Sequence, residues 1–246
     1  MSSVKRLHFM DIIKRQYLFK LKAYHNIIGS LFIFHIVALL LSFIGQSSTI
    51  FIEHVSITEH IHSSDIIISF SLLWIFIASI YVTNRASKQM MFHFITNKWT
   101  NHLSNGLFMI ILSVFGTITS IFLGLAYRLV VVLYYGIDQI FTYDSLSVTQ
   151  VLITLFVAFL YHLLVFSFGY VVGEIIQLHR SFVFLVPMLL FGILILVTNV
   201  FNDPYMFTFY IKESSLLLFS FKVFGSIFLF WLIAIFAGSR LEVYQS

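Results

Sequence analysis

Long apolar runs, separated by short polar segments, dominate the pattern of this chain. A helix rises about 1.5 Å per residue, so about 20 apolar residues cross the roughly 30 Å hydrocarbon core of a membrane. The pattern therefore predicts an all-α, polytopic membrane protein. Its six expected transmembrane helices are Ile27–Ile44, Ile66–Val82, Leu107–Tyr127, Val148–Val172, Phe182–Val200 and Leu216–Ala237, with Gly238 ending the last.

The residues before the first span follow a different pattern. Apolar and aromatic side chains recur every three or four residues from Leu7 to Tyr24, and most basic side chains lie off that stripe. This spacing predicts an amphipathic helix at the membrane interface. An ordinary basic flank that sets the orientation is the other interpretation, and the two are compatible. We therefore divide the chain into this interfacial helix, residues 1–26, and a single transmembrane domain, residues 27–246.

One interior segment, residues 83–104, is both basic and amphipathic. It has three basic residues among methionine and aromatic side chains, and it contains no acidic residue. Basic loops between spans lie on the cytoplasmic side of a membrane. Methionine and aromatic side chains in such a loop favour a docking surface for another protein. The alternative is an anchor that lies on lipid headgroups.

Composition and charge agree with this topology. The chain is 60% hydrophobic and 10% charged, with a mean hydropathy of +0.99, whereas soluble domains carry about 25% charged residues. Eleven of the 14 Lys and Arg residues fall on one side of the predicted spans. The other three are Arg128, Lys212 and Lys222. The positive-inside rule then places both termini and segment 83–104 in the cytoplasm, for a multi-pass protein of the bacterial cytoplasmic membrane.

The first outer loop, residues 45–65, gathers histidine and acidic residues without any Lys or Arg. Such side chains are metal ligands, but His60 and His62 lack the spacing of a zinc-binding helix. A solvated loop is the favoured interpretation, and metal binding there stays open. The chain has no cysteine, which excludes disulfides and thiolate ligands.

Small residues mark two expected helix-packing faces. One face carries a small residue at every fourth position of the third span, and the other is a GxxxG pattern near the end of the fourth. The residues are Gly116, Ser120 and Gly124, then Gly169 and Gly173. His35 and His162 lie inside spans, and Arg128 follows the third span, which either ends there or continues toward Tyr135. Whether these three residues contact a substrate or only neighbouring helices is left open.

Several kinds of chemistry are missing from the sequence. It contains no G-x-x-x-x-G-K-[ST] loop, no H-E-x-x-H and no G-x-S-x-G. No predicted span has a carboxylate at its centre, which weakens the case for ion-coupled transport. We therefore expect no enzymatic activity and no cofactor in this chain. Glu174 and Arg180 are expected on a short turn at the cytoplasmic side.

With the spans in place, nearly the whole chain resembles the permease subunits of type-2 ABC exporters. The shared features are the interfacial N-terminal helix, six spans, the basic loop between spans two and three, and the short turn at Glu174–Arg180. The resemblance implies a separate ATPase subunit that binds ATP and Mg²⁺, and a second permease copy. The expected contacts of the coupling helix with that ATPase are Arg85, Lys88, Phe92, Phe94, Lys98 and Trp99, with Glu174 and Arg180 as a second contact.

The resemblance also implies a class of substrate. Small Phe- and Ile-rich permeases of this kind are similar to the membrane subunits of phenol-soluble modulin exporters, which expel amphipathic helical peptides. We expect such peptides, or other lipid-like or antimicrobial molecules, to be exported through an apolar path, and no nucleic acid to bind. A channel or scaffold that works without an ATPase is the competing interpretation. The sequence leaves open the substrate, the direction of transport, and a homodimer or heterodimer.

Overall fold

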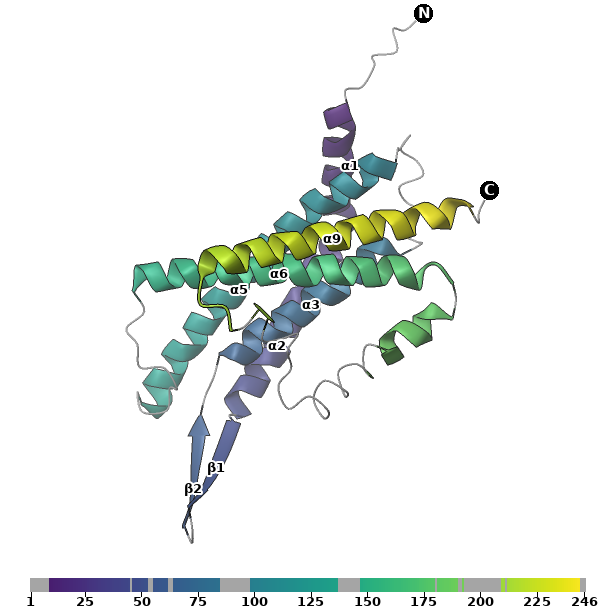
Figure 1. Cartoon of the computed structure of the whole chain (residues 1–246). Coiled ribbons are helices and arrows are strands. Elements are labelled where there is room, and N and C mark those ends of the chain that lie inside the picture. Colours follow the sequence, from purple (N-terminus) through teal and green to yellow (C-terminus); the bar gives the residue numbers. More distant parts are fainter. Residues whose placement is uncertain are drawn as a thin grey trace, which may run out of the picture. The chain divides into compact units, whose positions relative to one another are not determined.

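A computed structural model of the chain shows a predominantly helical protein with one short β-hairpin (Figure 1). The structure describes residues 9–44, 46–52, 55–61, 64–84, 98–136, 147–179, 181–189, 192, 209–210 and 212–243. Its elements are α1 (Phe9–Ala23), α2 (His25–Ile44), β1 (Gln46–Ile52), β2 (Val55–Ile61), α3 (Asp65–Thr83), α5 (Lys98–Tyr135), α6 (Val148–Ile176) and α9 (Leu216–Val243).

Among the described residues, five helices are long and apolar enough to cross a membrane, namely α2, α3, α5, α6 and α9. The prediction of a helical protein with several spans is confirmed to this extent. Of the span predicted at Phe182–Val200, the structure describes a helical stretch at 182–189 and residue 192. The rest lies outside the described residues, so a sixth span stays a prediction.

Large apolar side chains on α9 support a lipid-facing role for this helix. Phe221, Phe228 and Phe236 each leave more than 60% of their surface exposed. Contiguous apolar surface of this kind is rare on soluble monomers, because burying it from water is favourable by about 25 cal/mol per Å². Contact with lipid, or with a second membrane-embedded chain, removes these side chains from water.

Helix α5 is much longer than the predicted third span. It begins at Lys98, so the last residues of segment 83–104 are helical, and it continues past Arg128 to Tyr135. At about 1.5 Å per residue its 38 residues extend about 57 Å, well beyond the roughly 30 Å of a hydrocarbon core. The alternative that the third span continues toward Tyr135 is therefore confirmed, whereas its predicted start at Leu107 was too late, because the polar first turns of α5 carry no hydropathy signal.

Two further predicted boundaries are corrected. Helix α6 continues through Glu174 to Ile176, so Glu174 belongs to the helix and not to a turn. Helix α9 passes through Gly238 and ends at Val243. A Cβ atom at Gly238 would lie 3.5 Å from the Glu174 carboxylate and 3.6 Å from the His102 ring. These are ordinary contact distances, and the glycine lies within α9 without ending it.

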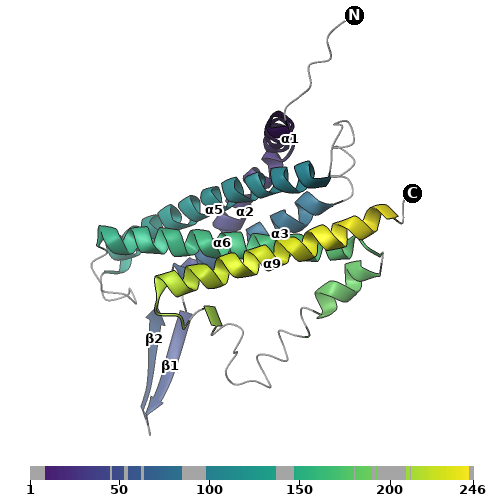
Figure 2. The same cartoon turned by 45° about the horizontal axis from the view of Figure 1, so that its top comes forward.

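The segment expected to be a solvated outer loop, residues 45–65, contains an antiparallel hairpin (Figure 2). Strands β1 and β2 pair from Gln46 with Ile61 to Ile52 with Val55. The segment is rich in β-branched residues, which favour extended backbone. Three of the six expected outer-loop ligands, Glu53, His54 and His62, lie outside the described residues. Within the described part of the chain, no group of three His, Cys, Asp or Glu side chains is placed to hold a metal.

The chain forms two compact units. Unit 1 contains Met1–Lys22, Phe76–Ile110 and Leu163–Ser246, and unit 2 contains Ala23–Ile75 and Ile111–His162.

In unit 2, helices α2, α3 and α5 meet around an apolar cluster of Ala38, Ile67, Tyr127 and Val131. The Tyr127 hydroxyl donates a hydrogen bond of 2.7 Å to the Ser42 carbonyl oxygen. This bond gives the ring a satisfied polar end within an otherwise apolar contact.

In unit 1, helices α3 and α6 approach closely at two glycines. A Cβ atom at Gly169 would collide with the Ser79 hydroxyl and lie 2.9 Å from the Phe76 carbonyl oxygen. A Cβ atom at Gly173 would collide with the Thr83 hydroxyl. The GxxxG pattern of α6 therefore lies directly on the second half of α3, as small residues at this spacing allow.

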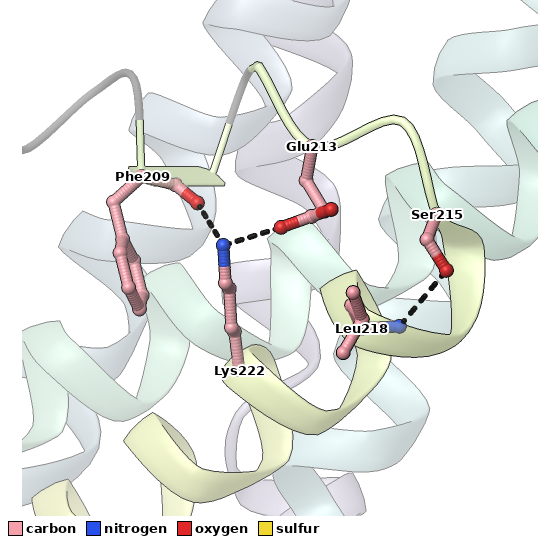
Figure 3. Close-up of polar contacts among 5 residues, drawn as sticks. All are labelled: Phe209, Glu213, Ser215, Leu218 and Lys222. Atoms are coloured by element: carbon pink, nitrogen blue, oxygen red, sulfur yellow. Dashed lines mark hydrogen bonds and ion pairs between the residues drawn. The ribbon is translucent and has the colours of Figure 1, made fainter.

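The start of α9 is joined to the residues just before it (Figure 3). The Lys222 ammonium group forms an ion pair with Glu213 and donates a 3.2 Å hydrogen bond to the Phe209 carbonyl oxygen. It also lies 4.3 Å from the centre of the Phe209 ring. The ammonium group also donates a hydrogen bond to the Glu213 carboxylate, and this bond lowers the pKa of Glu213. Sequence reasoning placed Lys222 near a membrane surface, but did not identify its partner.

The contact between α3 and α6 predicts that Gly169→Ala destabilises the protein strongly. The added methyl group meets backbone atoms that cannot rotate away, so the helices must separate, at a cost of about 1–3 kcal/mol or more. Gly225→Ala is the matched control, because no atom lies within 4 Å of its Cβ position. Thermal unfolding of the two variants in one detergent measures the difference. Equal unfolding temperatures would contradict the described contact.

Candidate functional site

A buried lysine on α1 is the centre of the most unusual site in unit 1. Lys20 is only 1% exposed, and its ammonium group donates to the Asn101 side-chain oxygen at 2.9 Å and to the Ser104 hydroxyl at 2.6 Å. It also donates to the side-chain oxygen of Asn105. One helical turn earlier, Gln16 donates to the Thr100 hydroxyl at 3.4 Å. Helix α1 is thus joined to the first two turns of α5 by polar contacts.

The buried face of α1 overlaps the predicted apolar stripe only in part. Of that stripe Ile13 and Tyr24 are buried, whereas Met10 is 71% exposed. The buried residues of α1 are Ile13, Gln16 and Lys20. These three positions also repeat at steps of three and four, so they lie on one face of the helix. The polar side chains of α5 select this face, because a buried amide or ammonium group needs hydrogen-bond partners.

From Asn105 the hydrogen bonds continue to α6. The Asn105 amide nitrogen donates to the Tyr170 hydroxyl at 2.9 Å, and the His102 Nδ1 lies 2.9 Å from the same hydroxyl. Tyr170 also interacts with the carboxylate of Glu174, one turn further along α6. Glu174 is 1% exposed. We call this group of residues the polar cluster: Gln16, Lys20, Thr100, Asn101, His102, Ser104, Asn105, Tyr170 and Glu174.

Helix α9 covers the polar cluster with an aromatic ring. Trp231 stacks on Tyr170, with ring centres 5.5 Å apart and planes within 14°, and meets His102 edge-on at 6.4 Å. Gly106 makes room for it, because a Cβ atom there would lie 3.0 Å from the indole. Gly238 of the same helix also faces Glu174 and His102, but a Cβ atom there would meet them only at ordinary contact distances. Aromatic cover keeps water away and so strengthens the polar interactions beneath it.

Burial also changes the titration of Lys20. Removal of the ammonium group from water lowers the pKa of Lys20 from 10.5 to about 7. Its hydrogen-bond partners are neutral oxygen atoms. They solvate the charged form but do not neutralise it. Near neutral pH this lysine therefore exchanges between the charged and uncharged forms.

The polar cluster suits a mechanical connection between helices. It joins α1, the first turns of α5 and the last turns of α6 through hydrogen bonds, and α9 packs against it. Hydrogen bonds are directional, and a fully buried network holds its members in one arrangement more firmly than apolar contacts do. A displacement of the start of α5 is therefore passed to the other members of the network.

The structure bears on the predicted ATPase contacts as follows. Trp99, at the start of α5, is 57% exposed, and its neighbour Thr100 belongs to the polar cluster. Lys98 is the first residue of that helix. Glu174 is buried in the polar cluster, so it does not form part of an exposed contact surface. The remaining predicted contacts, Arg85, Lys88, Phe92, Phe94 and Arg180, lie outside the described residues.

Most members of the polar cluster were not singled out from the sequence. Lys20 was counted only as a basic residue of the N-terminal segment. Asn101 is followed three and four residues later by Ser104 and Asn105, at the end of the basic segment 83–104. That repeat of polar residues on one face of α5 was the available signal.

The histidine of the fourth predicted span packs within unit 2. His162 is fully buried, with its Nε2 3.0 Å from the Ser71 hydroxyl and its Nδ1 3.2 Å from the Thr117 hydroxyl. Its Nδ1 also donates to the Ala158 carbonyl oxygen at 2.7 Å. The small residue Gly116 faces the same ring. Helices α3, α5 and α6 thus meet at a hydrogen-bonded histidine.

Comparison of the chain with protein-family models, with curated proteins and with solved structures finds no match.

The lowered pKa of Lys20 predicts a pH-dependent stability. Between pH 7 and 10 the unfolded chain keeps this lysine protonated while the folded chain releases the proton. The unfolded state then binds more protons, so the free energy of unfolding rises with pH, by at most about 1.4 kcal/mol per pH unit. Thermal unfolding of wild type and Lys20→Met between pH 7 and 9 measures this.

Only the wild type has this lysine, so its stability relative to Lys20→Met should increase across that range. Lys14→Met is the control, because Lys14 lies on the exposed side of α1. A constant difference between wild type and Lys20→Met at all pH values would contradict the burial of the ammonium group.

Proposed function

We propose that this chain is the transmembrane permease subunit of an ATP-driven exporter of the ABC-2 type, and that a separate ATPase subunit drives it. The observation that carries the proposal is the polar cluster, which joins the start of α5, at the end of the basic segment 83–104, to α1, α6 and α9. A protein moved by a partner needs such a stiff connection between the docking segment and its spans.

The expected orientation supports the same proposal. Both termini and segment 83–104 are predicted on the cytoplasmic side by the distribution of Lys and Arg. In unit 1 the polar cluster contains the first turns of α5 and the last turns of α6. With that topology these turns lie at the cytoplasmic ends of their spans, where a soluble ATPase subunit has access.

The mechanism follows from the connections in unit 1. The ATPase subunit, on binding ATP, presses on Trp99 and the basic residues before it, and the first turns of α5 shift. Lys20 and Asn105 carry the shift to α1, and Tyr170 carries it to α6 and to Trp231 of α9. The bundle then tilts as a body and opens a path between two copies of the chain.

The proposed cargo is an amphipathic peptide or another lipid-like molecule. Exposed Phe221, Phe224 and Phe228 give α9 a broad apolar face. A wall of this kind binds through burial of apolar surface, at about 25 cal/mol per Å², and so accepts varied side chains. Directional polar contacts, which would select one compound, are not required for such cargo.

The proposed docking at Trp99 predicts a loss of partner binding in Trp99→Ala. An exposed tryptophan at the centre of an interface commonly contributes 2 kcal/mol or more, so affinity for the ATPase subunit should fall at least about tenfold. Tyr134→Ala is the matched control, an exposed aromatic at the other end of α5. Co-purification of the two subunits and stimulated ATP hydrolysis provide the measurement. Unchanged binding by Trp99→Ala would show that Trp99 is not part of the interface. A chain that copurifies with no ATPase would favour a channel or scaffold.

The proposed orientation predicts the labelling of single cysteines in intact cells. The chain has no cysteine of its own, so Lys88→Cys introduces the only thiol. An impermeant maleimide should leave it unlabelled until the cells are opened, because segment 83–104 faces the cytoplasm. Asp144→Cys, in a predicted outer segment, should react at once. Labelling of Lys88→Cys in intact cells would overturn both the orientation and the proposed docking.

A further inference from the structure

Unit 2 contains a cavity of about 160 Å³, where α3 and α6 begin and α5 approaches its end. This volume is far above the roughly 15 Å³ that a single water molecule needs. The lining combines apolar side chains with polar ones. Its polar side chains and its one glycine are Ser64, Asp65, Ser120, Gly124, Arg128 and Thr154.

The small residues of α5 shape this cavity. Positions 116, 120, 124 and 128 lie on one face of the helix, because they are four residues apart. At Gly116 that face is filled, since a Cβ atom would lie 3.1 Å from the His162 ring and 3.3 Å from Trp74. At Gly124 the nearest atom is the Ser64 Cβ at 3.5 Å, an ordinary contact. The face thus packs tightly at one end and opens beside Arg128.

Arg128 is held in a defined position at the cavity. Its Nε donates a 3.1 Å hydrogen bond to the hydroxyl of Ser64, which is itself buried. A guanidinium group has five N–H donors in a planar fork, and this fork matches the oxygen atoms of phosphate. Half-buried in the lining, the group offers a fixed positive charge in surroundings of low dielectric constant.

The helix ends at the cavity also favour an anion beside Arg128. Helices α3 and α6 both begin at the cavity, and the N-terminal end of a helix carries a partial positive charge. Asp65 adds an exposed carboxylate to the lining, which repels a bare anion, so a bound anion has to carry a hydrogen-bond donor of its own. A carboxylate accepts hydrogen bonds from the hydroxyl or ammonium group that most phospholipid headgroups carry beyond their phosphate.

The height of the cavity along α5 points to the source of the anion. The apolar stretch Leu107–Tyr127 is about 31 Å long at 1.5 Å per residue, which matches one hydrocarbon core. Arg128 follows this stretch directly and is the one charged residue of α5 between Leu107 and Tyr135, so we place it at the level of lipid phosphates. Ser64 and Asp65, which precede the apolar part of α3, share the cavity with it.

We propose that this cavity binds the phosphate group of a phosphate ester through Arg128, and that a membrane phospholipid supplies the ester. Asp65 then accepts a hydrogen bond from the end of the headgroup, and the acyl chains lie along the apolar helices. The site involves only residues of unit 2 and requires no ATPase. It would therefore bind phosphate even if the proposed exporter function failed, and the two proposals are tested separately.

Native mass spectrometry of the purified full chain in detergent tests the site, with phosphatidylglycerol or uncharged diacylglycerol added. We expect the wild type to bind phosphatidylglycerol at least about tenfold more tightly than diacylglycerol, through charge-assisted hydrogen bonds. Arg128→Gln should lose about that factor, and Arg128→Lys should keep part of it. Gly124→Leu should also lose binding, because its side chain fills the cavity and leaves the arginine in place.

Lys222→Gln is the charge-matched control and should bind as the wild type does, because Lys222 is already paired with Glu213. Inorganic phosphate distinguishes the sources. Displacement of the lipid by millimolar phosphate supports a site for free phosphate esters, and no displacement supports the lipid headgroup. Equal affinity of the wild type for the two lipids would overturn the proposal. So would full binding by both Arg128→Gln and Gly124→Leu, each checked for folding by its unfolding temperature.

Discussion

The arrangement of unit 1 depends on one requirement, that an ammonium group removed from water must be surrounded by oxygen atoms. Lys20 meets this requirement with the side chains of Asn101, Ser104 and Asn105. Moving a charge into a protein interior costs several kcal/mol unless hydrogen bonds replace its water. The register between α1 and α5 is therefore fixed, since a slip of one residue would leave the lysine without partners.

The same requirement explains why this part of the molecule is polar while its surroundings are apolar. Asn105 has both a donor and an acceptor in its side chain, so it bonds to Lys20 on one side and to Tyr170 on the other. The apolar ring face of Trp231 then covers the site by stacking on Tyr170. Such a network specifies one arrangement of four helices, where apolar packing alone tolerates several.

How much of this was readable from the sequence differs between the spans and the site. The apolar helices were predictable because length and hydropathy suffice to identify them, and a lipid-facing helix needs no partner in the sequence. Their ends were less predictable, since a glycine often follows the end of a helix, yet Gly238 lies within one. The polar cluster was not predictable, because Lys20 and its partners are more than 80 residues apart in sequence. Only the structure pairs them.

The pairing of Lys222 with Glu213 has a consequence for how α9 fits a bilayer. Counted from the residue after Lys222, the uncharged part of the helix reaches only to Gly238 and extends about 24 Å, shorter than the core it has to cross. Because Glu213 neutralises the charge of Lys222, the whole Leu216–Gly238 stretch, about 34 Å, is compatible with hydrocarbon. The Glu213 carboxylate thus sets the hydrocarbon thickness that this helix matches, and therefore the bilayers that fit the protein without mismatch.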